Sequence, residues 1–338
     1  MKLPSPRGPL SNAVFAALRG QAPLPLVLPR SSIEDNQISL WTLYELHYRG
    51  FDGVDDRAEW DPALLAARRA IEEPFEADLR MLTSDLVARA QEEKHLVAQL
   101  ERIVAEPGPS VASYLHRDAT REQFEEFLAL RSIYHLKESD PQSWALARLR
   151  GAPKAALAEI QYDEYGAGNP AGVHQTLYAD ALDSVGLDSS YCAYIDDVPA
   201  QFLAVNNAMS LFGLHRRLLG ASMGHLAAFE MTSSLPCRRM AQGAERLNMP
   251  QAVHHYFDEH VEADAVHEQL ASRSLCVPLI DAEPELHHDV LFGAATCVLL
   301  DAIAAAQSLA EWTDVSEPRS SATTPRPASV RTSLTASP

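Results

Sequence analysis

The scarcity of strand-like alternation is the feature that most constrains how this chain can fold. Residues with high helix propensity dominate the 338-residue sequence, and few segments alternate apolar with polar residues as half-buried strands do. With 46% hydrophobic residues, the chain can bury a large core as one domain or two. The sequence therefore predicts an all-α protein.

Local start and stop signals place several helices. Thr120 and Gln123 form a capping box that opens a helix, and this helix is expected to stop at Asp140–Pro141. Pro236 is expected to end a long helical block over residues 200–235. Further helices are predicted over residues 39–51, 61–90, 94–105, 152–168, 255–271 and 284–312.

Composition divides the chain into three parts. Residues 1–35 are rich in proline and are expected to form an N-terminal arm. Residues 36–315 hold the helical domain, and the Ser/Thr/Pro-rich segment 316–338 is predicted to be a disordered tail.

Charge and cysteine content exclude several classes of function. The formal net charge of −18 opposes binding to nucleic acid or to an anionic membrane. The four cysteines are far apart and form no CxxC pair, which argues against disulfides and thiolate zinc sites. The apolar run 290–300 is too short to span a bilayer. We expect a soluble, cytoplasmic protein.

One predicted helix carries a possible set of metal ligands. His260, Asp264 and His267 are separated by four and three residues, which keeps their side chains within roughly 60° of one another on a helix. If this face points inward, it presents imidazole, carboxylate and imidazole to a metal.

Three further donors precede that helix. Glu138 and Glu164 each follow an apolar stripe on a predicted helix, where a buried carboxylate needs a partner or a metal. His174 lies ten residues after Glu164, across glycines and a proline that allow the two to converge. Taken singly, these residues also fit a solvated carboxylate at a helix end and an ordinary loop histidine. Glu230 also has apolar neighbours in the sequence. It fits a residue that contacts the substrate, a group that contacts a metal ligand, or a structural glutamate.

Together these positions supply three carboxylates and three imidazoles: Glu138, Glu164, His174, His260, Asp264 and His267. Such a donor set suits two first-row transition metals and leaves positions for O2. Zinc alone more often uses fewer ligands.

In order and spacing, this pattern resembles the haem-oxygenase-like di-metal oxidases, also labelled iron-containing redox enzymes. The family pattern is a Glu, then Glu-x9-His, then His-x3-Asp-x2-His, and no position is missing here. The strings "YHLKESDPQSW", "DEYGAGNPAGVHQTLY" and "AAFEMTSSLPCRRM" are also similar to the family, and the likeness runs from about residue 38 to 312.

The resemblance implies a seven-helix core bundle, with additional N-terminal helices in this chain, that holds two Fe(II) ions instead of haem. Manganese is an alternative metal, and O2 is the co-substrate. Such enzymes usually belong to specialised metabolite biosynthesis and often form homodimers. They oxidise small molecules by N-oxygenation, oxidative C–C cleavage, desaturation or ring closure, and an external electron donor is expected.

If the chain is such an oxidase, its substrate is expected to be a free amino acid or a derivative. Its carboxylate needs a cation, for which Arg131 is the candidate, and its ammonium needs an acid, for which Glu230 is the candidate. The alternatives are a ferritin-like di-iron protein, for which only an incomplete Glu-x-x-His pattern is present, a haem protein, and a non-catalytic helical metabolite-binding protein.

Overall fold

The computed structural model of the chain describes residues 1–313, except for the side chains of Glu262, Asp264 and Ala265. Residues 1–313 contain helices and a single isolated bridge but no β-strand. The all-α prediction is confirmed. The predicted tail, residues 316–338, lies outside the described residues.

The chain forms helices of very different lengths. The α-helices are α1 (Pro9–Leu18), α2 (Ile33–Glu45), α3 (Pro62–Ala90), α4 (Leu96–Val104), α5 (Val111–Arg117), α6 (Arg121–His135), α7 (Asp140–Leu146), α8 (Gly151–Glu164), α9 (His174–Ser184), α10 (Ala200–Leu214), α11 (Leu219–Arg246), α12 (Gln251–Gln269), α13 (Val277–Ala282) and α14 (His287–Thr313). Short 3-10 turns cover Asp56–Trp60, Gly166–Gly168, Pro170–Gly172, Arg216–Leu218 and Pro284–Leu286, and a π-helical stretch, Leu270–Cys276, joins α12 to α13.

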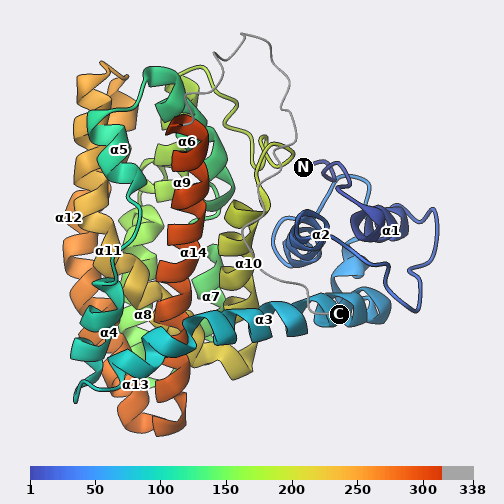
Figure 1. The fold of residues 1–338 in the computed structure, drawn as a ribbon, viewed down its shortest axis with the longest axis horizontal. Coiled ribbons are helices and arrows are strands. Elements are labelled where there is room, and N and C mark those ends of the chain that lie inside the picture. The colour runs from blue at the N-terminus through green and yellow to red at the C-terminus, as the bar shows by residue number, and fades with distance from the viewer. Residues whose placement is uncertain (314–338) are drawn as a thin grey trace.

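Most helices stand side by side in one bundle, and α1 and α2 pack beside it at the far end of α3 (Figure 1). Helix α11 is central and packs against α14 and α12. Its contact with α14 depends on two glycines, because a Cβ at Gly224 would collide with the Val290 carbonyl and a Cβ at Gly293 with the Ala221 carbonyl. The two backbones can approach this closely only where no side chain separates them.

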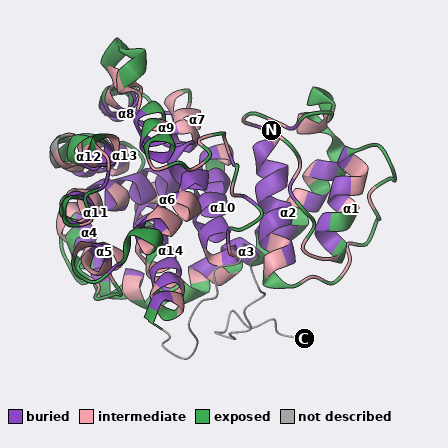
Figure 2. Cartoon of the chain, turned by 90° about the horizontal axis from the view of Figure 1, so that it is seen from above, coloured by how far each residue is buried: buried purple, intermediate pink, exposed green. Residues whose placement is uncertain are grey.

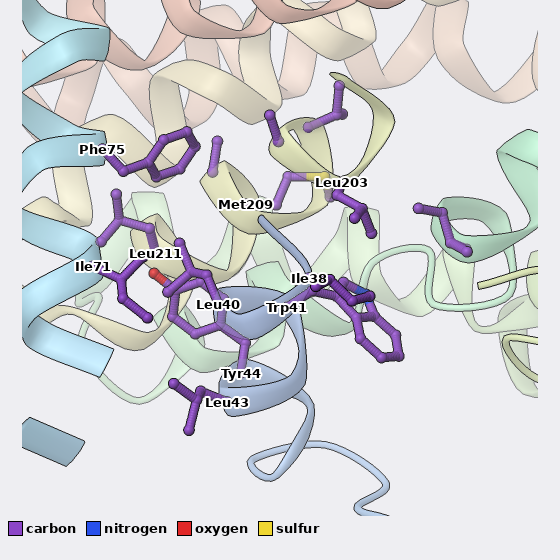
Figure 3. Packing of buried hydrophobic residues seen from close by; sticks show 14 of the residues in the cluster. Ile38, Leu40, Trp41, Leu43, Tyr44, Ile71, Phe75, Leu203, Met209 and Leu211 are labelled. Atoms are coloured by element: carbon purple, nitrogen blue, oxygen red, sulfur yellow. The ribbon is translucent and has the colours of Figure 1, made fainter. Parts of the chain in front are cut away.

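The N-terminal helices belong to the packed structure. Buried Asp35 of α2 accepts the backbone N–H groups of Leu10 and Ser11 at 2.9 and 2.7 Å, which anchors the first turn of α1. The arm predicted for residues 1–35 is therefore partly helical. Seen from above, buried residues line the faces of α2 and α10 (Figure 2). Helices α2 and α10 pack together through an apolar cluster to which α3 also contributes (Figure 3). The cluster contains Ile38, Leu40, Trp41, Leu43, Tyr44, Ile71, Phe75, Leu203, Met209 and Leu211.

The structure confirms one of the local signals and overturns another. The capping box of Thr120 and Gln123 is formed at the start of α6. The block 200–235 is instead two helices that break at His215, and α11 continues through Pro236 to Arg246. An internal proline costs about 3 kcal/mol. The long packing of α11 against α12 and α14 outweighs that local cost.

The segment Pro284–Thr313, which contains α14, is the one described segment that is long and apolar enough to cross a membrane. Of its most apolar window, 61% is buried inside the structure. That burial is typical of a core helix of a soluble protein, and the prediction of a soluble chain agrees with it.

Candidate metal centre

Glu138 lies in a tight corner between two helices. Helix α6 ends at His135 and α7 begins at Asp140, so the prediction that the first of these helices extends to Glu138 and stops at Asp140–Pro141 was wrong. Ser139 adopts a left-handed conformation with φ of 65°, and this turns the chain sharply after Glu138. Gln175 of α9 donates to the Glu138 carbonyl at 2.8 Å. The corner is therefore fixed, and the Glu138 side chain is 4% exposed.

Glu164 and His174 lie close together because the two ends of the loop between them are paired. A backbone bridge pairs Tyr165 with Val173, which brings the last residue of α8 beside the first residue of α9. Gly166 permits this closure, since its φ is +79° and a Cβ would lie 2.6 Å from the Val173 nitrogen. As a result, Glu164 Oε2 lies 3.0 Å from His174 Nδ1.

Two histidines of α12, His260 and His267, are held by groups behind their rings. Nδ1 of His260 donates to the Tyr256 carbonyl at 2.7 Å, because a carbonyl can only accept. Nε2 of His267 faces the Asp163 carboxylate at 3.3 Å. The opposite nitrogens then point inward, with His260 Nε2 3.5 Å from Glu138 and His267 Nδ1 3.4 Å from Glu164. Such partners fix the tautomer and the orientation of metal-binding histidines.

These side chains form two adjacent groups of three buried donors. The first contains Glu138, His174 and His260, and the second contains Glu164, Glu230 and His267. Within each group the donor atoms all lie within 4.8 Å of one another. Glu164 lies between the groups, because Oε2 faces His174 of the first and Oε1 faces His267 of the second.

Glu230 of α11 lies among the donors of the second group, where its Oε2 atom lies 3.6 Å from His267 Nδ1. This placement favours a role as a metal ligand. Its expected contact with the substrate ammonium stays a prediction.

Several buried atoms of the site are left without hydrogen bonds to other described residues. They are His174 Nδ1, His267 Nδ1 and Glu230 Oε2. Buried polar atoms nearly always have a hydrogen-bond partner, and these three atoms face only other ionisable groups of the site, which is the arrangement that a metal centre requires. The mixture of carboxylate oxygens and imidazole nitrogens fits iron or manganese better than a thiolate-binding metal. The residues present therefore fit two metal ions.

Burial and mutual contact shift the pKa values of the donors. Burial raises the pKa of Glu164, but the adjacent imidazoles of His174 and His267 outweigh it and lower that pKa to about 2. Burial lowers the pKa of His267, but the carboxylates of Glu164 and Glu230 raise it to about 11. Burial also raises the pKa of Glu230. The second group therefore attracts a cation strongly, and in the metal-free protein that cation is a proton.

A small cavity of about 10 Å³ adjoins the donors, enough for about one water-sized group. Tyr134, Leu226 and Phe229 form its apolar wall, and Gln142 adds a polar group. The Gln142 Oε1 atom is buried and has no hydrogen-bond partner among the described residues. The apolar wall excludes bulk water, and Gln142 offers a hydrogen bond to whatever enters.

This geometry does not test two of the predicted residues. Asp264 lies in α12 between His260 and His267, but its side chain is outside the described residues. Arg131 does not line the cavity: its guanidinium lies over the Tyr134 ring and 3.5 Å from Asp301. Both assignments stay predictions.

Sequence reasoning missed three residues that touch the donors. Tyr256 and His135 contact Glu138, and Asp163 contacts His267. Tyr256 could have been found, since it precedes His260 by one helical turn on the same face. The contact of Asp163 depends on the packing of α8 against the π-helical stretch that follows α12, which no local pattern indicates.

With this geometry in place, comparison with known proteins identifies the family. A model of the iron-containing redox enzymes matches residues 125–302, more than half of the chain. The chain belongs to the iron-containing redox enzyme family. The matched range includes both groups of donors, whereas α1 to α5 precede it.

A match to one curated relative is more specific than the family match, but it covers only part of each of the two chains. The nitrosourea synthase of Streptomyces achromogenes subsp. streptozoticus is 27% identical over 147 residues. These residues are 44% of this chain and 31% of the relative, so the match spans less than a third of that protein's length.

Proposed function

We propose that this chain is an O2-dependent, non-haem di-iron oxidase or oxygenase of specialised metabolism. The observation that carries the proposal is the pair of buried donor groups with Glu164 between them. Glu138, His174 and His260 would hold one iron, and Glu164, Glu230 and His267 the other. Asp264 would complete the set. When bound, two Fe(II) ions supply electrons and open positions for the reduction of O2.

The protein residues would hold the two ions at separate positions and exclude water from them. Glu164 contacts histidines of both groups, so it is the carboxylate best placed to bridge the ions. Asp163 and the Tyr256 carbonyl hold the rings of His267 and His260 in the binding orientation. The apolar cavity wall would keep water from the oxidised centre.

The substrate is proposed to be a free amino acid or a derivative. The relative is named for making a nitrosourea, a compound with an N–N=O group, and this supports nitrogen oxidation among the possible outcomes. An external electron donor, a homodimer and a cytoplasmic location complete the proposal. If Arg131 binds the substrate carboxylate, Arg131→Ala weakens apparent substrate affinity. Unchanged affinity would remove that role.

Iron stoichiometry and O2 uptake test the proposed function. The chain is loaded anaerobically with Fe(II), its bound iron is counted, and O2 consumption is then followed. We expect two irons per chain and consumption of O2. His174→Ala and His267→Ala should each lose iron, whereas His255→Ala, an exposed histidine on the same helix α12, should keep both ions.

The rival functions give different results in the same experiment. A ferritin-like protein would take up many more than two irons per chain. A helical metabolite-binding protein would take up none and consume no O2.

A further inference from the structure

A buried ion pair joins α2 to the corner that carries Glu138. Lys137 Nζ lies 3.0 Å from Glu45 Oε2, and the two side chains are 3% and 0% exposed. Lysine and glutamate are almost never buried this completely, because removal from water disfavours each charge. The proposed metal centre uses neither residue as a ligand. The position of the pair, one residue from Glu138, indicates another role.

Further contacts hold both ends of this ion pair. The Tyr191 hydroxyl donates to the other carboxylate oxygen of Glu45, Oε1, at 2.9 Å. The Lys137 ammonium also lies 3.5 Å from the centroid of the Tyr48 ring, and the face of an aromatic ring attracts a cation. Because a buried ion pair is stable only with good geometry and additional partners, these contacts keep the Lys137 ammonium at one position.

A second set of contacts connects the segment after α2 to the same corner. The Arg49 guanidinium donates to the Leu136 carbonyl at 3.2 Å and to Gln175 Oε1 at 2.8 Å. The amide nitrogen of Gln175 in turn donates to the Glu138 carbonyl at 2.8 Å. The chain just after α2 therefore holds the backbone before Glu138 and, through Gln175, the carbonyl of Glu138 itself.

The corner needs such support because its backbone is strained. Ser139 is a non-glycine residue with φ of 65°, and a residue in this conformation persists only where the surrounding structure holds it. The two residues before it direct their side chains to different partners. Lys137 contacts Glu45 of α2, whereas the Glu138 carboxylate lies 3.5 Å from His260 Nε2. A fixed Lys137 side chain therefore fixes the direction of the side chain that follows it.

We propose that Lys137 is a positioning residue for the first metal. Its ion pair with Glu45 holds the corner so that the Glu138 carboxylate faces His174 and His260 before a metal binds. This inference rests on the proposed function, since these three residues must bind a metal. The family match begins at residue 125, so α2 supports the metal site from outside the matched range.

Mn(II) affinity at each donor group tests this role. The full-length chain is titrated with Mn(II), and the unbound ion is counted from its electron paramagnetic resonance signal. His174→Ala and His267→Ala, which each remove a ligand from one group, assign the two binding steps. Lys137→Met should weaken binding at the first group about 10-fold or more and leave binding at the second within about 2-fold. Lys137→Arg, which keeps the cation, should keep most of the first-group affinity.

Two control variants separate positioning from a general loss of stability. Arg80→Met breaks the ion pairs of Arg80 with Glu76 and Asp289, at 2.9 and 3.0 Å, which join α3 to α14. This variant should destabilise the chain and leave both Mn(II) affinities unchanged. The double variant Glu45→Gln/Lys137→Met leaves no buried charge unpaired, so its thermal stability should return toward that of the parent chain. Its first-group affinity should stay low, because the ion pair is still absent.

Two results would overturn the inference alone. One is a Lys137→Met chain that binds Mn(II) at the first group as tightly as the parent chain. The other is a double variant in which thermal stability and first-group affinity recover together, since the ion pair would then only stabilise the fold. A parent chain that binds no Mn(II) at either group would instead refute the proposed function, and this inference with it.

Discussion

The proton on His267 should compete directly with metal at the second donor group. The carboxylates of Glu164 and Glu230 outweigh the effect of burial and raise the pKa of His267 to about 11. At pH 7 this leaves His267 protonated in the metal-free protein. Each unit of pKa corresponds to about 1.4 kcal/mol, so removal of the proton at pH 7 costs about 5 kcal/mol that metal binding must offset.

The sign of the pH dependence follows from this competition. Below about pH 11 a metal must displace one proton from His267, so its apparent affinity should rise about tenfold per pH unit between pH 7 and 9. The same proton stabilises the metal-free fold. That contribution is complete below the unfolded-state pKa of about 6.5 and is lost as the pH rises toward 11.

Calorimetry with Mn(II), which avoids oxidation, measures the released proton. Titrations in two buffers of different ionisation enthalpy give the number of protons released per metal. We expect about one proton for the second group at pH 7, and His267→Gln should remove this release, whereas His255→Gln should not. Mn(II) affinity that is independent of pH, with no proton released, would show that His267 is neutral and would refute the electrostatic argument.

Three substitutions test other parts of the site. Asp163→Asn weakens the hold on His267 and should lower metal affinity about 10- to 100-fold at unchanged circular dichroism; unaltered affinity would contradict this role. Gly166→Ala strains a residue at positive φ and should destabilise the chain by about 1–3 kcal/mol in thermal denaturation, so an unchanged melting temperature would count against the pairing of the loop ends. Asp264→Ala should lose iron and O2 consumption while helical circular dichroism is kept, and full activity would mean that the site is misplaced.

The sequence was informative where the signal is local. Helix formers and caps predicted the helical class, and the spacing of His260 and His267 placed both on one face of α12. The proposal that Glu164 meets His174 also came from spacing, but only the Tyr165–Val173 bridge shows how they meet.

Other features depend on contacts between distant segments. Glu138 lies in a corner that Gln175 supports from α9, and helical periodicity cannot predict such a corner. Pro236 stays within a helix because packing of α11 outweighs local propensity. Glu230 was recognised as a buried acid, but its proximity to His267 results from α11 and α12 lying side by side.

The most direct test of two ions flanking Glu164 is anomalous diffraction at the iron edge from crystals loaded with Fe(II) under anaerobic conditions. We expect two iron peaks, one beside Glu138, His174 and His260 and the other beside Glu164, Glu230 and His267. A single peak, or iron bound away from these residues, would contradict the di-iron centre.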